Sequence, residues 1–464
     1  MPMPRISLNT QAAKQFIRPF VPVGLLDLMA RRHYEMKAKL SAQQRSDNNA
    51  TPTPTSENVA SPRSATAIIF YWSHLFGTTE ALATFAKNAL IALEVDVTMV
   101  NIDAQADLEV YADAGTNYDF AISVGSLPLA KRVAGRPLYE VFGENFYLWV
   151  LDPIIYDLQK FLFVRQYLNA SQRSSRLRFL FWERDYANLV TELTSPEQVR
   201  YFPFGGHFYV PSSSTDDVAR IPRLAIIGTV GAELAKVSSS DLDGLATSSD
   251  TPNVSSALRS RYFDAIESVG GNANVTMVAR DVLGIEVKQL LSVEWLPFLT
   301  RVDSYEKRRR RLLVAAALRG IPVDFYGTGW KEHVPPDESF QFLDAVSFNA
   351  QPRLLRRYRG LVNFDPNLED GLHDRVYTAL GNGCRVITNT NRATVEVDAP
   401  HGTLYTYDIN APELADSAAE VLNAANIPDH DILALRRNHC WQSRVDAVFT
   451  FPDEHGGPLP VSAE

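Results

Sequence analysis

Runs of β-branched and aromatic residues alternate with segments of helical periodicity after residue 64. The run ATAIIFYW (65–72) has the length and composition of a strand, and 73–94 continues as a loop and a helix with apolar residues at helical spacing. Two further runs, VDVTMVNID (95–103) and YDFAISVGS (118–126), also predict strands. Because strands that alternate with helices form parallel sheets, this pattern predicts an α/β domain.

The same alternation begins again past the middle of the chain. The run RLAIIGTVG (223–231) predicts a strand that ends in a glycine turn. A helix is expected from about 305 to 319, followed by a break at 320–322, a strand, and a second turn that contains Gly327 and Gly329. The remaining expected elements are strands at 360–366 and 384–390, a helix between them, and a helix at 411–425.

These two halves predict an α/β fold of two Rossmann-like domains with parallel sheets that face each other across a cleft, because open parallel sheets bind ligands at the carboxyl ends of their strands. The chain length agrees, since 464 residues exceed what one hydrophobic core usually covers. We expect the joint between the domains within 199–222. The expected ranges are 65–212 for the first domain, 213–440 for the second, and 441–464 for a C-terminal tail that can cross back to the first domain.

Residues 1–64 differ from the rest in composition, and they predict a basic amphipathic segment followed by a linker. Residues 41–64 are rich in Ser, Thr, Asn and Pro, as flexible linkers are. Residues 1–45 carry eight basic and two acidic residues, a net charge of +6 against −15 for the rest of the chain. Within them, 16–37 mixes apolar residues with arginines, as a helix lying on an anionic membrane does. A helix packed against its own protein is the alternative, since prolines interrupt the period.

The overall composition narrows the class of protein. Apolar residues make up 45% of the chain and charged residues 21%, which indicates a globular protein. The net charge of −9 gives no reason to expect a nucleic-acid partner. Two cysteines, Cys384 and Cys440, offer neither a disulfide framework nor a zinc site. No run of about 18 apolar residues occurs, so we expect a cytoplasmic protein without a spanning helix.

One stretch, NLEDGLHDRVYTALGNGCRVITNT (367–390), places charged and flexible residues directly before a helix of about three turns. Glu369 or Asp370 is the expected N-cap, and Gly383 is the expected left-handed residue after the helix. The N–H groups at a helix start attract anions, and Gly371 would let a ligand approach the backbone. The stretch therefore predicts an anion site.

The helix start alone is too weak for such a site, because it stabilises a negative group by about 0.3–2 kcal/mol whereas micromolar affinity needs about 8 kcal/mol. His373 and Arg375 can add charge-assisted hydrogen bonds of about 1.5–3 kcal/mol each. Glu369 or Asp370 can accept hydrogen bonds from a ribose. The alternative is a solvated cap in which Arg375 pairs with the neighbouring acids.

The order of several short motifs resembles a known family. The C-terminal half is similar to the GT-B glycosyltransferases, and most closely to the CgeB-like branch of the family 1/4-type enzymes. The resemblance covers roughly residues 65–450, with supporting stretches VDFYGTGW, LVNFDP, FYLWVLDP and FGTTE. The main motif precedes the strand run CRVITN and consists of Gly371, Arg375, Tyr377, Ala379 and Gly383.

This resemblance implies that a sugar nucleotide lies on the second domain, with its pyrophosphate at the helix start and no cofactor. Asp241 and Asp243 could suggest a metal site, but their Ser-rich setting and the family argue against one. In related retaining enzymes a glutamate holds the ribose where Thr378 stands here, and threonine cannot offer two carboxylate oxygens. The stereochemical outcome is therefore not inherited. The implied donor-binding residues are Gly327, Gly329, Glu369, Asp370, Gly371, Leu372, His373, Arg375 and Thr378.

In the first domain, the loop SHLFGTTE (73–80) is where such enzymes approach the donor and acceptor. Gly77 and Thr78 are the acceptor-side candidates, and Thr78 is also, with its neighbour Thr79, a candidate N-cap of the following helix. His74 is a candidate general base, although it can equally be an ordinary loop histidine. Asp152 is similar to an acid of the family that lines the cleft, or else it is a turn residue before a proline.

The resulting prediction is a hexosyltransferase that moves a sugar from a nucleoside-diphosphate sugar to a glycan, lipid-linked or protein acceptor in surface polysaccharide, glycolipid or glycoprotein synthesis. We expect it in the cytoplasm, with a peripheral membrane contact through residues 1–45 as a further option. The alternatives are a non-catalytic sugar-nucleotide-binding or scaffold protein of a polysaccharide assembly complex, and a GT-B-type sugar-nucleotide epimerase.

Overall fold

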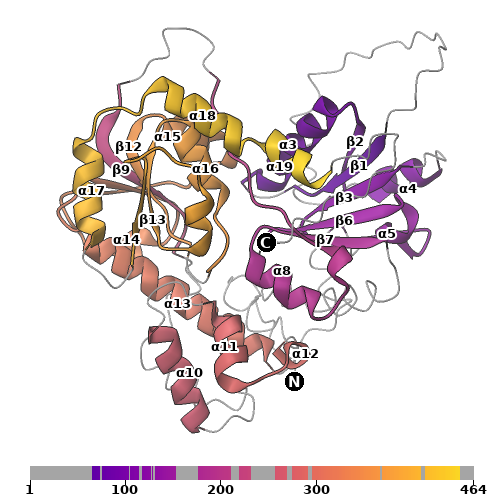
Figure 1. Cartoon of the computed structure of the whole chain (residues 1–464), viewed down its shortest axis with the longest axis horizontal. Helices are drawn as coiled ribbons and strands as arrows, with labels where there is room; N and C mark the ends of the chain where they lie inside the picture. Colours follow the sequence, from indigo (N-terminus) through magenta and orange to yellow (C-terminus); the bar gives the residue numbers. More distant parts are fainter. Residues whose placement is uncertain are drawn as a thin grey trace, which may run out of the picture. The chain divides into compact units, whose positions relative to one another are not determined.

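The computed structural model divides the chain into two compact units, Met1–Arg63 and Ser64–Glu464. The predicted amphipathic segment and linker lie outside the described residues. Figure 1 shows the second unit, which contains two sheets with helices packed around each. The residues described are 65–73, 76–103, 105–113, 118–126, 128, 131–152, 176–210, 219–230, 256–268, 274–290, 295–365, 368–408 and 413–449.

The first sheet has six parallel strands in the order β2-β1-β3-β6-β7-β8. The chain order therefore reverses between β1 and β3, as in doubly wound sheets of the 2-1-3 type. All five residues of β3 are buried, which places this strand at the centre of the core. The strands are β1 (Thr66–Tyr71), β2 (Asp96–Asn101), β3 (Phe120–Val124), β6 (Asn145–Val150), β7 (Leu177–Phe181) and β8 (Val199–Tyr201).

The second sheet also has six parallel strands, in the order β11-β10-β9-β12-β13-β14. This is the 3-2-1-4-5-6 order of the Rossmann fold, and it reverses between β9 and β12. The strands are β9 (Ile221–Ile227), β10 (Val323–Tyr326), β11 (Phe340–Leu343), β12 (Tyr358–Val362), β13 (Arg385–Asn389) and β14 (Leu404–Tyr407), and a separate antiparallel pair is formed by β4 (Arg132–Val133) and β5 (Arg136–Pro137).

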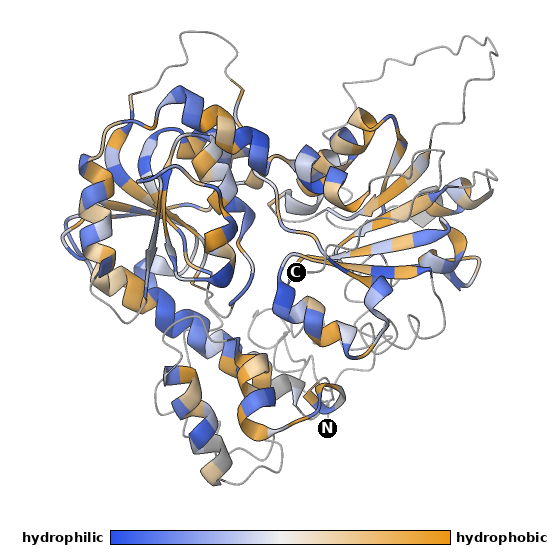
Figure 2. Cartoon of the chain, in the orientation of Figure 1, coloured by the Kyte–Doolittle hydropathy of each residue, from blue (hydrophilic) through white to orange (hydrophobic). Residues whose placement is uncertain are grey.

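Helices surround both sheets, and in Figure 2 the longest of them, α13, is largely hydrophilic while the strands are largely hydrophobic. None of the helices in the described part of the chain is both long and apolar enough to cross a membrane. The helices are α3 (Thr78–Ala92), α4 (Gln105–Asp113), α5 (Leu138–Val141), α8 (Arg184–Thr191), η3 (Pro196–Gln198), α10 (Ser256–Ser268), α11 (Val275–Leu283), α12 (Val287–Leu290), α13 (Leu296–Ala317), α14 (Trp330–His333), η6 (Phe348–Ala350), α15 (Gln351–Leu355), α16 (Asp374–Gly381), η7 (Arg392–Glu396), α17 (Glu413–Asn423), α18 (Asp429–His439) and α19 (Trp441–Val448).

The prediction of an α/β fold with two parallel sheets is confirmed. The strands expected at 65–72, 95–103, 118–126 and 223–231 correspond to β1, β2, β3 and β9. The helix expected at 305–319 is found, but it begins nine residues earlier, because Pro297 occupies its first turn, where a missing N–H costs nothing. The predicted threonine N-cap of α3 is wrong, since the left-handed residue Gly77 holds that position.

The last described helix, α19, packs against α3 of the first sheet. The Trp441 ring stacks on Phe85 at 5.8 Å and meets Trp149 edge-on at 5.2 Å, measured between ring centroids. Just before it, Cys440 forms a β-bridge with Gly206. The end of the described chain is therefore part of the core of the first sheet.

The segment between the two sheets runs alongside α16. The N–H of His207 donates to the Thr378 hydroxyl at 3.0 Å, and the N–H of Tyr209 donates to the Asn382 side chain at 2.9 Å. Between these two bonds, the Phe208 ring occupies the space beside Gly381, where a Cβ would lie 2.1 Å from a ring carbon. We name residues 205–210 the crossover segment. It is held to α16 by hydrogen bonds and by a close aromatic contact.

We predict that Trp441→Ala lowers the free energy of unfolding by about 3–5 kcal/mol, because it removes a ring that is 6% exposed. Urea unfolding followed by far-UV circular dichroism measures this change. Val395→Ala is the control, since Val395 is 88% exposed and its truncation should change stability by less than about 0.5 kcal/mol. Equal stability of the two variants would contradict the packing of α19 described above.

Candidate functional site

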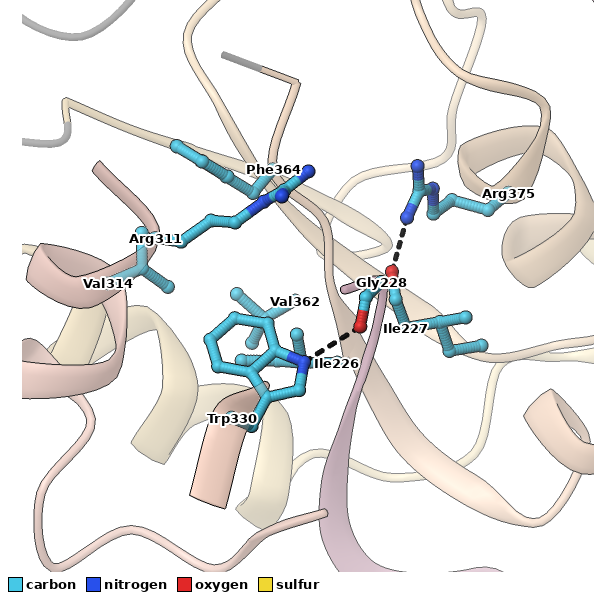
Figure 3. Close-up of a pocket in the computed structure, with 9 residues that line it drawn as sticks. All are labelled: Ile226, Ile227, Gly228, Arg311, Val314, Trp330, Val362, Phe364 and Arg375. Atoms are coloured by element: carbon cyan, nitrogen blue, oxygen red, sulfur yellow. Dashed lines mark hydrogen bonds between the residues drawn. The ribbon is translucent and has the colours of Figure 1, made fainter. Parts of the chain in front are cut away.

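A small pocket lies at the carboxyl ends of β9 and β12, where the strand order of the second sheet reverses. Open parallel sheets bind their ligands at such a position, because the loops diverge there and leave a crevice. Figure 3 shows the side chains that come together at this point from the sheet and from α13, α14 and α16. The lining residues are Ile226, Ile227, Gly228, Arg311, Val314, Trp330, Val362, Phe364 and Arg375.

Two arginines reach this pocket from different helices. Arg375, in the first turn of α16, donates to the carbonyl of Ile227, and Arg311 of α13 donates to the carbonyl of Thr229. In Figure 3 their guanidinium groups extend from opposite sides toward the end of β9. The Nε of Arg375 is buried and has no hydrogen-bond partner among the described residues. A buried donor without a partner is unfavourable, so this group is suited to an anionic ligand.

Gly327 and Gly329 hold the end of β9 in place. A Cβ on Gly327 would lie 1.8 Å from the carbonyl oxygen of Gly228, and one on Gly329 would lie 1.7 Å from that of Val230. Both glycines have positive φ, at 136° and 86°. Next to them, the Trp330 indole N–H donates to the Gly228 carbonyl at 2.7 Å. The space at both glycines is filled by backbone, and their implied role in donor binding stays a prediction.

The start of α16 differs from the sequence prediction. The N-cap is His373, and neither Glu369 nor Asp370 caps the helix, because the helix does not begin until Asp374. The N–H of His373 donates to the buried carboxylate of Asp365 at 3.1 Å, which ties the helix start to the loop after β12. At the other end, Gly383 follows the C-cap with a φ of 71°, so the predicted left-handed residue is confirmed.

The two acids before α16 have partners within the protein. Asp370 forms an ion pair with Arg184 at 2.9 Å and a second, at 3.5 Å, with Arg392. Glu369 accepts a hydrogen bond from the N–H of Asn274 at 2.9 Å. Of the acids named in the alternative cap, Asp370 and Glu369 have these other partners, Asp374 lies beside Arg375, and Arg375 itself donates to a carbonyl of β9. A ribose contact of either acid would therefore compete with bonds already formed.

Three other residues of this stretch face the protein interior. A Cβ on Gly371 would lie 2.7 Å from the carbonyl oxygen of Trp182, so the chain itself packs closely on that side of the glycine. Leu372 is 1% exposed and belongs to the core. Thr378 is 2% exposed and accepts its hydrogen bond from the crossover segment. The contact of these three residues with a donor stays a prediction.

His373 and Asp374 lie at the helix start itself. The imidazole Nδ1 of His373 contacts the Asp374 carboxylate, and the same carboxylate is buried beside Arg375. Although burial raises the pKa of Asp374, the contacts with His373 and Arg375 outweigh it and hold that pKa below its ordinary value. Asp374 is therefore the acid that balances the cationic side chains of this turn.

The first-domain candidates lie on the loops after β1 and β6. His74 falls outside the described residues, as do Asp241 and Asp243. Gly77 has open space around it, since a Cβ there would meet nothing within 4 Å, and Thr78 is the first residue of α3. Asp152 is exposed at the carboxyl end of β6. Burial lowers the pKa of the partly buried Lys307, whose amine Asp303 binds at 3.0 Å, and the charge of Asp152 acts in the opposite direction, raising that pKa.

Sequence reasoning did not identify Arg311 or the acid Glu183. Arg311 is the last residue of the run RRRR, which has the composition of a solvated helix face. Only the strand order of the sheet shows that Arg311, unlike the arginines before it, lies at the pocket. Glu183 caps α8, accepts from the N–H of Tyr186 at 2.7 Å, and is 1% exposed. Burial, together with the neighbouring charge of Asp185, raises the pKa of Glu183 from 4.5 to about 8.

No family model and no curated protein matches this chain. Its fold is similar to that of several solved glycosyltransferases. One is a glycosyltransferase involved in avilamycin A biosynthesis, with 10% identity, a TM-score of 0.45, and coverage of 82% of this chain and 95% of that one. Sucrose-phosphate synthase from Thermosynechococcus elongatus has 10% identity, a TM-score of 0.40, and coverage of 83% and 95%.

A third similar structure, Anabaena HepE in complex with UDP and glucose, has 10% identity, a TM-score of 0.40, and coverage of 83% of this chain and 95% of that one. Likeness at this level carries no argument about activity. The family assignment suggested by the sequence motifs, including the CgeB-like branch, stays a prediction.

The raised pKa of Glu183 predicts a pH dependence of stability. Between the ordinary pKa of 4.5 and the folded-state pKa of about 8, the folded chain holds a proton that the unfolded chain has released. The contribution of Glu183 to the free energy of unfolding is therefore largest below pH 4.5. It is lost as the pH rises to 8, and the free energy of unfolding falls by up to about 1.4 kcal/mol per pH unit in this range.

Glu183→Gln should remove this contribution, because the amide keeps the acceptor oxygen but does not ionise. Urea unfolding at pH 5.5 and pH 8 measures the difference for each variant. The wild-type chain should lose more stability between these two pH values than Glu183→Gln, whereas Glu109→Gln, a change at an exposed position of α4, should behave as wild type. The assignment of a buried, protonated Glu183 is wrong if all three chains lose the same amount.

Proposed function

We propose that this chain is a glycosyltransferase that moves a sugar from a nucleoside-diphosphate sugar to an acceptor. The observation that carries the proposal is the pair of guanidinium groups, from Arg311 and Arg375, at the switch point of a Rossmann-type sheet. The pocket is small, so it suits the diphosphate of a donor, with the base and sugar beyond it.

The chemistry needs the cations at the pocket. In sugar transfer the bond between the anomeric carbon and the phosphate oxygen breaks, an acceptor oxygen forms the new bond, and the acceptor loses a proton. Negative charge develops on the leaving diphosphate, and fixed cations near it stabilise the transition state more than the ground state. The carbonyl groups of residues 227 and 229 already hold Arg375 and Arg311 in place. Neither side chain needs to rearrange to stabilise the transition state.

We further propose that a side chain of the first domain accepts the proton that the acceptor loses. Asp152 is exposed at the carboxyl end of β6, and its charge reaches Lys307 of α13, so it lies near an element that also carries Arg311. A positioned base of this kind contributes about 10²–10⁴-fold to rate. His74 is the second candidate from the same domain. The acceptor we propose is a glycan, lipid-linked or protein acceptor of surface polysaccharide, glycolipid or glycoprotein synthesis.

The first test is binding. Arg375→Ala should weaken the affinity for UDP, or for the best of a panel of nucleoside diphosphates, by about tenfold or more, because a charge-assisted hydrogen bond is lost. Isothermal titration calorimetry measures this. Arg437→Ala, an exposed arginine of α18, is the control and should bind as wild type. Unchanged affinity in Arg375→Ala would show that the diphosphate is not bound here.

The second test separates chemistry from binding. Asp152→Asn should lower the rate of sugar transfer by about 10²-fold or more and leave nucleoside-diphosphate affinity nearly unchanged, since that affinity resides in the second domain. Transfer and slow donor hydrolysis are followed by the release of nucleoside diphosphate. Full transfer by the variant would exclude Asp152 as the base. A wild-type chain that binds the donor but neither transfers nor hydrolyses it would favour a scaffold role.

We also propose that residues 1–45 bring the enzyme to an anionic membrane surface, because they carry a net charge of +6. Each basic residue near such a surface contributes about 1 kcal/mol, which salt screens. Co-sedimentation with phosphatidylglycerol vesicles should occur at low salt and should be lost on deletion of 1–45. Equal sedimentation of the full-length and truncated chains would contradict the proposal.

A further inference from the structure

Three arginines meet at the amino ends of β9 and β12, on the opposite edge of the second sheet from the donor pocket. Arg220 directly precedes β9, Arg356 lies between α15 and β12, and Arg436 is in the last turn of α18. Since β9 has seven residues, this group lies on the order of 20 Å from the pocket. We name it the rear arginine cluster.

Backbone carbonyls at the end of α16 hold two of these side chains. Arg436 donates from Nε to the carbonyl of Gly381 at 2.6 Å and from a terminal nitrogen to that of Tyr209 at 3.1 Å. Arg220 donates to the carbonyl of Asn382 at 2.9 Å and to that of Tyr358 at 2.8 Å. Each guanidinium has five N–H groups, so each keeps donors for another partner.

The third arginine, Arg356, has no such anchor. Its guanidinium lies over the Tyr209 ring at 5.5 Å, and its side chain donates no hydrogen bond to any described residue. One of its terminal nitrogens is buried without a partner. A half-buried guanidinium that bonds neither carbonyl nor carboxylate is unusual, because such groups normally satisfy their donors.

The rear arginine cluster also lacks acidic neighbours. None of its three arginines forms an ion pair with a carboxylate in the described part of the chain, and Arg359 and Arg385 add further positive charge beside Arg220. Burial and the charge of Arg356 lower the pKa of both Arg220 and Arg436. The C-terminus of α16 offsets only about half a unit charge. Counted over the described residues, the cluster therefore keeps more than two positive charges that no carboxylate offsets.

We propose that the rear arginine cluster is a second binding site, for a phosphate-bearing ligand, separate from the donor pocket. Phosphate matches it because guanidinium groups bind its oxygens in pairs and because a dianion compensates the remaining charge. Arg356 supplies free donors, and Arg220 and Arg436 flank it in fixed positions. Free phosphate compounds and the headgroups of anionic lipids share this chemistry, and the experiment distinguishes them.

The test uses inorganic phosphate as the probe and labelling by phenylglyoxal, an arginine reagent, as the readout on the full-length wild-type chain. Phosphate should protect Arg356 from modification, as measured by mass spectrometry of the peptide that contains it. Arg353, which is exposed on α15, is the matched internal control and should stay as reactive as before. Equal reactivity of Arg356 with and without phosphate, and also with and without phosphatidylglycerol vesicles, would overturn the proposal.

A variant identifies the residue responsible. Arg356→Gln removes no hydrogen bond to any residue that the structure describes, so it should fold as wild type by circular dichroism. Calorimetry with inorganic phosphate on the Arg375→Ala chain, in which the donor pocket is weakened, should show binding that falls about tenfold or more when Arg356→Gln is added. Binding that is unchanged by Arg356→Gln would refute the site. Protection by vesicles alone, also lost in Arg356→Gln, would assign it to lipid headgroups.

Discussion

The hydrogen bonds that Thr378 and Asn382 accept from the N–H groups of His207 and Tyr209 fix α16 against the crossover segment, and much of the rest depends on them. This short helix lies between the second sheet and the chain that leads into it, and almost all its residues are buried. Its first turn places Arg375 at the end of β9, while its last carbonyls orient Arg220 and Arg436. A shift of α16 would therefore move the groups at both edges of the sheet together.

The sequence pattern predicted the parallel sheets, the helix that became α16 and the left-handed conformation of Gly383, because strand runs and a C-terminal glycine are local signals. It did not predict the partners of Glu369 and Asp370, since Asn274 and Arg184 are about 95 and 186 residues away in the chain. The same reason explains Arg311. A run of four arginines has the composition of an exposed helix face, and only the strand order brings the last of them to the switch point. The roles of these residues depend on partners that are distant in the sequence, and local composition does not predict those partners.

Charge is distributed unevenly over this part of the molecule. Around the first residues of α8, the acids Glu183, Asp185 and Asp370 lie close together, and Arg184 and Arg392 neutralise two of them, so Glu183 keeps its proton. The arginines that reach the donor pocket and the rear edge, by contrast, donate to carbonyl oxygens, which carry no net charge, although Asp374 lies beside Arg375. An arginine paired with a carboxylate serves structure, whereas one held by carbonyls stays attractive to an anion. This distinction, more than the number of arginines, separates the ion pairs around the start of α8 from the proposed binding sites.

The contact between Phe208 and Gly381 links two positions that are far apart in the sequence. A Cβ on Gly381 would lie 2.1 Å from the Phe208 ring, and one on Gly206 would lie 2.4 Å from the same ring. Any side chain at either glycine therefore requires a smaller residue at 208. In an alignment of related chains, positions 206, 208 and 381 should vary together, with an aromatic residue at 208 only where both partners are glycine. Such a correlated triplet would identify the crossover segment in homologues too distant for the helix motif to be recognised.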